Sequence, residues 1–138
     1  MALHLLDTNV VSEAGRPRPD PGVVAFLRRE RDLCVSVILF EELSFGLERA
    51  PPERRARLTL FVEGVYAQFG ALALPVDLDI ARLSGRLRAN ANNEGRALRM
   101  ADALMAATAL THGAILVTRN ARDFRGLGVD VFNPFSFD

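Results

Sequence analysis

The segment Leu3-His4-Leu5-Leu6-Asp7-Thr8-Asn9 constrains the fold of this chain most strongly, because a short apolar run leads straight into a carboxylate. A run of this length that ends in polar residues is typical of a buried strand. In open α/β sheets, ligands bind at the carboxyl ends of the strands. The sequence therefore predicts a strand over residues 3–6, with Asp7 at the edge of the sheet where chemistry takes place.

Short apolar segments alternate along the chain with longer segments of helical periodicity. Strands are expected at residues 3–6, 33–35, 72–75, 114–118 and 129–132, and helices at about 9–14, 21–31, 37–49, 53–69, 79–91 and 100–112. Asp20 and Ser36 are expected N-terminal caps, and Gly113 an expected C-terminal cap. A polar loop is expected at residues 90–95. This alternation predicts an α/β fold with a parallel sheet and right-handed crossovers.

The 138 residues, of which 49% are hydrophobic and 25% charged, have the composition of one globular domain, expected to span residues 1–138. The single cysteine, Cys34, lies in an apolar run and is expected to be a buried hydrophobe. Asp7 interrupts the N-terminal apolar stretch and no basic region precedes it, so we expect no signal peptide. No apolar run is long enough to span a membrane, which predicts a cytoplasmic protein without a membrane partner.

The formal net charge is zero, and all 17 basic residues are arginines. A chain with this charge can bind a polyanion only through local arginine clusters or bound cations. P-loop NTPases require a lysine at the phosphates, so the lack of lysine excludes that class. It also argues against receiver domains and haloacid-dehalogenase-type phosphatases, although a biased genomic base composition would produce the same arginine usage.

Glu41 and Glu42 are adjacent on one expected helix and therefore point about 100° apart. Glu41 falls on the polar face. Glu42 falls on the packing face with Leu39, Leu43 and Phe45, where an unpartnered carboxylate is costly. Glu42 is therefore the functional candidate, and the structural alternative is a side chain that reaches solvent from the rim of the apolar stripe.

Asp102 lies in the first turn of an alanine-rich helix, where the helix dipole alone favours a carboxylate. However, Ala106 and Ala109 lie on the same face and indicate close packing, which favours a functional role. Asn120 and Asp123 follow the strand at 114–118, and both are also common turn residues. The functional interpretation places Asn120 or Asp123 beside Asp7.

Four ordered segments, together with a C-terminal strand, resemble the PIN domain family, specifically the VapC and FitB toxins of prokaryotic toxin–antitoxin systems. The matching segments are LLDTNVVSE, SVILFEELSFGLER, MADALMAATAL, ILVTRNARDF and VFNPF. The resemblance implies a PIN-like three-layer fold, with a central parallel sheet of four to five strands flanked by helices. It places the family's acidic quartet on Asp7, Glu42, Asp102 and Asn120. Many members have Asp at the last position, and Asp123 is the alternative source of that charge.

Carboxylates that converge at a sheet edge repel one another, and a divalent cation removes this conflict. An all-oxygen set formed by Asp7, Glu42 and Asp102 suits Mg²⁺ or Mn²⁺ rather than Zn²⁺. Such ions activate water and stabilise a leaving oxygen in phosphodiester cleavage. His4 and His112 are expected to be structural, because one lies inside a strand and the other at a helix end.

The resemblance implies a metal-dependent endoribonuclease that cleaves RNA and is neutralised by a cognate antitoxin. The alternative is a weakly active or inactive PIN-like binding module that reaches DNA only through a DNA-binding antitoxin, in transcriptional autoregulation. The expected substrate contacts are Thr8, Asn9, Thr118, Arg119 and Arg99. Thr8, Asn9 and Thr118 could equally orient a carboxylate, whereas the arginines are expected to hold a phosphate. The helices at 37–69 carry more apolar side chains than one face can bury, which predicts an antitoxin groove or a homodimer contact.

Overall fold

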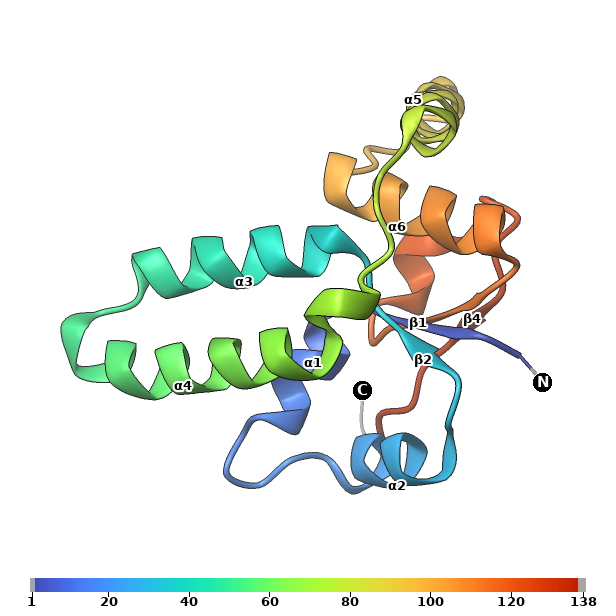
Figure 1. Cartoon of the computed structure of the whole chain (residues 1–138). Coiled ribbons are helices and arrows are strands. Elements are labelled where there is room, and N and C mark those ends of the chain that lie inside the picture. The colour runs from blue at the N-terminus through green and yellow to red at the C-terminus, as the bar shows by residue number, and fades with distance from the viewer. Residues whose placement is uncertain (1, 137–138) are drawn as a thin grey trace.

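The computed structural model describes residues 2–136. Within this range the sheet has four strands in the order β2-β1-β3-β4, and all neighbouring strands are parallel. The strands are β1 (His4–Leu6), β2 (Leu33–Cys34), β3 (Ile115–Val117) and β4 (Val131–Phe132). The predicted α/β fold with a parallel sheet is thus confirmed (Figure 1).

The helices are close to the predicted segments, and the helix at 37–49 and that at 100–112 have the predicted bounds. They are α1 (Thr8–Ala14), α2 (Pro21–Arg29), α3 (Val37–Arg49), α4 (Pro52–Phe69), α5 (Leu78–Asn93) and α6 (Met100–His112), with 3₁₀ turns at Gly70–Leu72 and Ala121–Phe124. Ser36 caps α3 by accepting a hydrogen bond from the Ile38 amide (3.0 Å). Gly113 ends α6 at a φ of 62°, as expected of a left-handed C-terminal cap.

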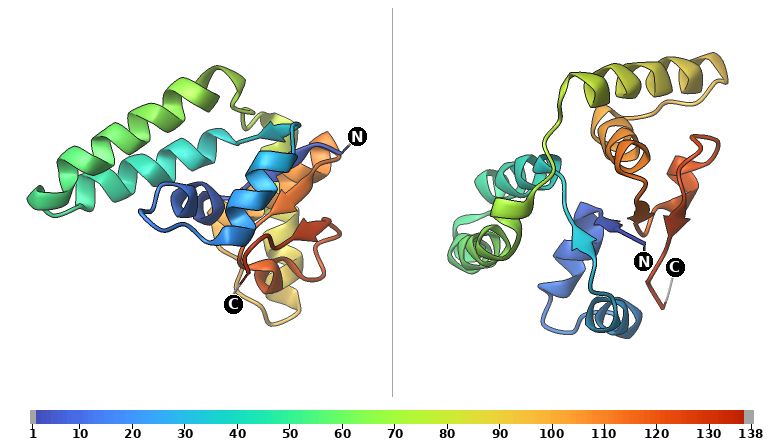
Figure 2. Two further views of the ribbon diagram at one scale, coloured as in Figure 1. Left: turned by 90° about the horizontal axis from the view of Figure 1, so that it is seen from below. Right: turned by 45° about the vertical axis from the view of Figure 1, so that its right-hand side comes forward.

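Helices cover both faces of the sheet, which gives the three-layer arrangement. Successive strand residues point to opposite faces. Leu5 and Leu116 therefore pack into the core beneath α5 and α6, whereas Leu6 and Val117 pack into the core formed with α1, α2, α3 and α4. The α3–α4 hairpin projects well beyond the sheet (Figure 2, left).

Two sequence predictions are wrong. The expected strand at 72–75 is absent from the described residues. Its segment begins in a 3₁₀ turn and makes a single bridge between Leu74 and Ser36. Pro75 then has no amide hydrogen with which to continue the ladder. The expected loop at 90–95 is also shorter, because α5 continues to Asn93.

Cys34 is buried, as predicted, and burial raises the pKa of its thiol to about 11. Among residues 2–136, no helix is both long enough and apolar enough to cross a membrane.

Gly22, in the first turn of α2, is a position at which only glycine fits. A Cβ there would lie 2.3 Å from the carbonyl oxygen of Pro134, a backbone atom of the C-terminal segment. We predict that Gly22→Ala lowers the free energy of unfolding by about 1–3 kcal/mol, because the backbone must move. Urea denaturation measures this. Gly46→Ala is the matched control, because nothing lies within 4 Å of its Cβ position; equal losses in both variants would contradict the packing argument.

Candidate active site at the carboxyl ends of the strands

Asp7 follows β1 directly and caps α1, so the chain itself delivers this carboxylate to the edge of the sheet. The side chain is only 7% exposed. One oxygen accepts a hydrogen bond from the Thr8 amide (2.7 Å), and the other accepts one from the Thr118 hydroxyl (2.8 Å). Burial raises the pKa of Asp7, and the hydrogen bonds from Thr118 and Thr8 only partly oppose this. Asp7 is therefore held in a fixed orientation while its negative charge is poorly compensated.

The polar residues around Asp7 orient the acid and each other. The Asn9 amide donates to the Thr118 hydroxyl oxygen (3.2 Å), and its own carbonyl oxygen accepts from the Arg119 amide (3.1 Å). Thr118 is fully buried, and its hydroxyl already donates to Asp7. Of the two roles expected for Thr118, the geometry therefore supports orientation of a carboxylate rather than contact with a substrate.

Glu42 reaches the same edge from α3, and the helix-phase prediction is confirmed, since Glu41 is exposed and the Glu42 side chain is only 25% exposed. The Thr8 hydroxyl donates to one Glu42 oxygen (2.5 Å), and Thr8 is the residue that follows Asp7. The expectation that Phe45 packs on the same face is wrong, because Phe45 is 57% exposed. Its ring is instead covered in part by the Arg49 guanidinium, 5.4 Å from the ring centre.

Asp102 comes from α6, and Arg99 connects it to Glu42. The Arg99 guanidinium lies 3.3 Å from a Glu42 oxygen and 3.6 Å from an Asp102 oxygen. The pKa of Asp102 is raised, and burial is the largest cause. The positive charge of Arg99 opposes this shift, whereas the negative charges of Asp7, Asp123 and Glu42 add to it. The contacts of Thr8 with Asp7 and Glu42, and of Arg99 with Glu42 and Asp102, bring the acid after β1 and those of α3 and α6 to one edge of the sheet.

The two candidates for the fourth acidic position differ in the structure. Asn120 is exposed, and its backbone amide donates to the Thr118 hydroxyl oxygen (3.1 Å). Asp123 is also exposed, in the 3₁₀ turn that follows, and its charge raises the pKa of Asp102. Asp123 thus carries a charge near Asp102, and Asn120 contributes a backbone contact to Thr118.

The histidines lie apart from this cluster, in line with the structural roles expected for them. His4 begins β1, at the opposite end of the strand from Asp7, and its ring packs edge-on against Phe26. His112 is exposed in the last turn of α6.

The donor chemistry of the acids fits a hard divalent cation, because Asp7, Glu42 and Asp102 offer only oxygen and their charges are mutually repulsive. In the arrangement described for residues 2–136, no three acidic, histidine or cysteine side chains are grouped closely enough to enclose an ion. Arg99 lies against Glu42 and Asp102 instead. A bound ion would thus replace the Arg99 guanidinium as the neutralising charge.

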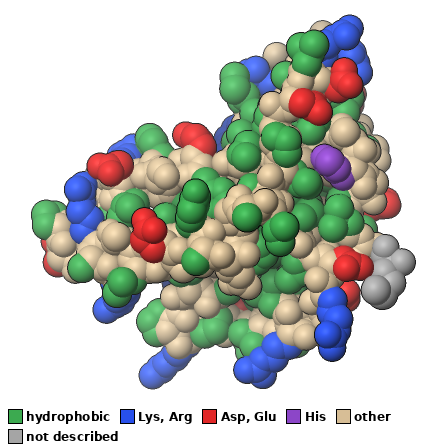
Figure 3. Space-filling model, in the orientation of Figure 1, with side chains coloured by type: hydrophobic (Ala, Val, Ile, Leu, Met, Phe, Trp, Pro, Cys, Tyr) green, Lys and Arg blue, Asp and Glu red, His purple; other side chains and the backbone are tan. Residues whose placement is uncertain are grey.

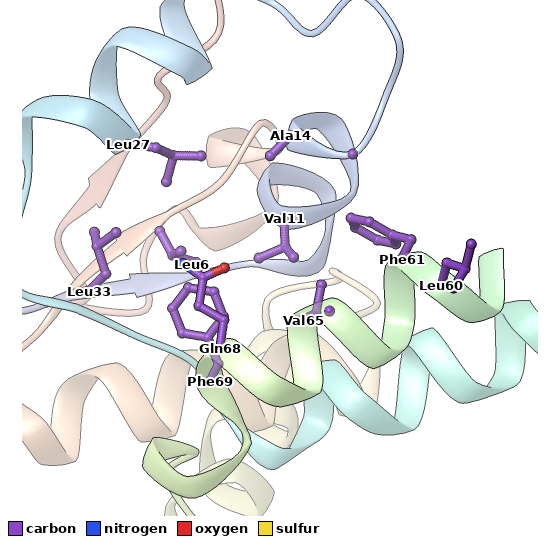
Figure 4. Close-up of a pocket in the computed structure, with 12 residues that line it drawn as sticks. Leu6, Val11, Ala14, Leu27, Leu33, Leu60, Phe61, Val65, Gln68 and Phe69 are labelled. Atoms are coloured by element: carbon purple, nitrogen blue, oxygen red, sulfur yellow. The ribbon is translucent and has the colours of Figure 1, made fainter. Parts of the chain in front are cut away.

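Two cavities lie between α1 and α4, and only the second is lined by residues of the acidic site. The first has a volume of about 400 Å³ and lies between α4, α1 and α2, where Phe61, Val65 and Phe69 face Leu6 and Val11 (Figure 4). The second has a volume of about 680 Å³. Its lining includes Thr8, Asn9 and Glu42, together with Arg54 and Arg57 of α4. Neither arginine stands out in the sequence, although their spacing of three residues places them on one helix face.

Comparisons with known proteins agree with this geometry. The family model described as PIN domain matches residues 4–129. The chain is similar to VapC ribonuclease Y4jK of Sinorhizobium fredii, with 37% identity over 137 residues that cover 95% of this chain and 96% of the relative. It is also similar to toxin FitB of Neisseria gonorrhoeae, with 33% identity over 95% of this chain and 97% of the relative.

A solved structure shares the fold over nearly the whole chain. It is the structure of FitAB bound to the IR36 DNA fragment, with a TM-score of 0.85 and 31% sequence identity, covering 99% of this chain and 98% of that chain.

Proposed function

Because this chain belongs to the PIN domain family, we propose that it is the endoribonuclease toxin of a type II toxin–antitoxin system, with a single PIN domain over residues 1–138. One observation carries the proposal. Asp7, Glu42 and Asp102 come from three separate elements, and the contacts of Thr8 and Arg99 link them at one edge of the sheet. The most similar relatives include a ribonuclease and a toxin, which matches a carboxylate site of this kind.

Asp7, Glu42 and Asp102 would hold Mg²⁺ or Mn²⁺. When bound, the ion supplies an activated water and charge stabilisation for phosphodiester cleavage. Thr118 and Thr8 fix the orientations of Asp7 and Glu42 through the hydrogen bonds already described. Mutation of such partners of metal-binding side chains typically lowers metal affinity or activity about 10- to 100-fold.

Arg99 has two roles in this proposal. In the structure it neutralises Glu42 and Asp102. Its side chain is 70% exposed, so the guanidinium would also be able to bind an RNA phosphate. Arg119 and Asn9 lie at the same edge and line the larger cavity, so they contribute further polar contacts to the substrate.

The test uses purified protein and RNA, with Mg²⁺ or Mn²⁺ added and then removed by a chelator. Cleavage that depends on the ion is the expected result, and sequencing of RNA ends after brief induction in cells identifies the cut sites.

The second candidate function is a PIN-like module without cleavage that acts with a DNA-binding antitoxin. Asn120 at the fourth position and the Arg99 contacts favour it. Absence of cleavage at every metal concentration would support that second function.

The partners that we propose are an antitoxin and, through it, DNA, because the similar toxin FitB is known in the FitAB complex bound to a DNA fragment. The apolar cavity of about 400 Å³ suits an amphipathic antitoxin segment, because Leu6, Val11 and Phe69 line it (Figure 4). An arginine or lysine from that segment could reach the acids and replace the metal ion electrostatically.

We also predict a homodimer. On the face shown in Figure 3, hydrophobic side chains extend over the hairpin and the centre, while arginines lie mainly at the edges. Tyr66, Leu72 and Leu78 are each more than 60% exposed. Sedimentation without antitoxin should give about twice the chain mass of 15.1 kDa, and Leu72→Glu should shift it toward one chain mass. A wild-type mass of one chain at micromolar concentration contradicts this prediction.

A further inference from the structure

The larger cavity, of about 680 Å³, continues from the acidic site into the space enclosed by α1, α3 and the first half of α4. Thr8, Asn9 and Glu42 line its inner end, and Arg54 and Arg57 line its outer end. This volume is within the range of sites that bind small molecules and is large enough for a short stretch of an extended polymer. A ligand that occupies the acidic site can therefore continue along this cavity without leaving the protein surface.

Arg54 and Arg57 give the outer end of the cavity its positive charge. They are three residues apart and thus neighbours on one face of α4, where two like charges repel each other. Both are exposed, and neither forms a salt bridge with any acid in the described part of the chain. In contrast, Arg16, in the same cavity, is paired with Glu13 at 3.3 Å. The repulsion between Arg54 and Arg57 would be relieved by a bound anion.

The same face of α4 also carries apolar side chains. Leu58 and Phe61, each four residues beyond one of the two arginines, line the cavity together with Leu43 of α3. Gly46 of α3 leaves one side open, since a Cβ there would meet nothing within 4 Å. A surface with alternating guanidinium groups and apolar or aromatic side chains suits a single-stranded nucleic acid, whose phosphates and bases it can contact in turn.

We propose that this cavity binds the RNA strand next to the scissile phosphate, and that Arg54 and Arg57 contact the backbone phosphates one or two nucleotides away from it. The proposal rests on the proposed ribonuclease function and assigns the path of its substrate. A chain with zero net charge depends on such local arginine pairs to hold a polyanion near an acidic centre. The cavity therefore sets the direction in which the RNA crosses the site.

The test measures binding of a fluorescent single-stranded RNA across a range of salt concentrations, in an Asp7→Asn background so that the RNA stays intact. Each phosphate contact with a single strand contributes about 0.7 to the slope of log affinity against log salt. Arg54→Gln with Arg57→Gln should therefore reduce the slope by about 1.4 and weaken binding on the order of tenfold at about 0.1 M salt. Each single variant should give about half of the change in slope.

The matched control is Arg86→Gln with Arg88→Gln on α5, which removes the same charge from exposed positions outside this cavity. Arg55→Gln is a control on α4 itself, because Arg55 donates to the Glu48 carbonyl and does not line the cavity. Gln is a good helix former, so α4 should stay folded in all variants. In the active protein, the Arg54 and Arg57 variants should raise KM for RNA and leave kcat nearly unchanged.

The outcomes separate this proposal from the function on which it rests. Normal metal-dependent cleavage, with an unchanged salt slope and KM in the Arg54 and Arg57 variants, overturns the assigned path alone. Loss of antitoxin affinity in these variants, without any change in RNA affinity, also overturns it and assigns the cavity to the protein partner. If the unmodified protein neither binds nor cleaves RNA, the proposed function fails and the path with it.

Discussion

We expect Asp7→Asn to abolish RNA cleavage and to leave the fold intact. Mutation of a residue that only hydrogen-bonds to a metal ligand typically lowers metal affinity or activity about 10- to 100-fold. Removal of a carboxylate that is proposed to bind the ion directly should therefore lower activity at least about a hundredfold. The fold survives because an asparagine at this position keeps an oxygen that can accept from the Thr8 amide, as Asp7 does at 2.7 Å. Cleavage assays and circular dichroism on the same preparation measure both effects. An active Asp7→Asn variant would exclude Asp7 as a ligand.

The difference in stability between Asp7→Asn and the wild type should also depend on pH, in a defined direction. Burial raises the pKa of Asp7 above its ordinary value of 3.8, so the native state holds this proton more tightly than the unfolded state. The contribution of protonated Asp7 to stability is therefore present below pH 3.8 and is lost as the pH rises through the native pKa. In metal-free buffer, Asp7→Asn should melt above the wild type at pH 7, and the difference should shrink as the pH falls toward 3.8.

Glu42→Gln should inactivate the protein, whereas Glu41→Gln should be nearly silent. Both changes remove one charge from neighbouring positions on α3, so each is a control for the other. Glu42 accepts a hydrogen bond from Thr8 and lies 3.3 Å from Arg99, whereas Glu41 is exposed to solvent. We expect a loss of at least about a hundredfold for Glu42→Gln and less than about twofold for Glu41→Gln. The opposite ranking would show that the assignment of the α3 face is wrong.

Sequence reasoning located the acids of the site because their local patterns conflict with purely structural roles. Asp7 interrupts an apolar run, and Glu42 falls on a packing face, so both positions demand a partner. The main helices were also predictable, since Ser36 caps α3 and the alanine-rich α6 ends at Gly113. The prediction of the sheet was less accurate. Leu74 makes a single bridge, to Ser36, and Pro75 has no amide hydrogen with which to extend the pairing.

Other features of the site depend on distances between elements that no local pattern encodes. Arg99 was expected to contact phosphate, yet in the structure it bridges Glu42 and Asp102, which lie on different helices. Phe45 was expected to be packed, but it is 57% exposed. Arg54 and Arg57 share a helix face in sequence, but only the packing of α4 beside α1 and α3 gives that face a cavity to line.

The central claim is that Asp7, Glu42 and Asp102 form one metal centre that cleaves RNA. The most direct test titrates Mn²⁺ into chelator-treated wild type, Glu41→Gln and Asp102→Asn while RNA cleavage is followed. We predict that cleavage rises with Mn²⁺ in the wild type and in Glu41→Gln, and stays at background in Asp102→Asn at every concentration. Cleavage by the wild type without added metal, or a normal titration by Asp102→Asn, would contradict the claim.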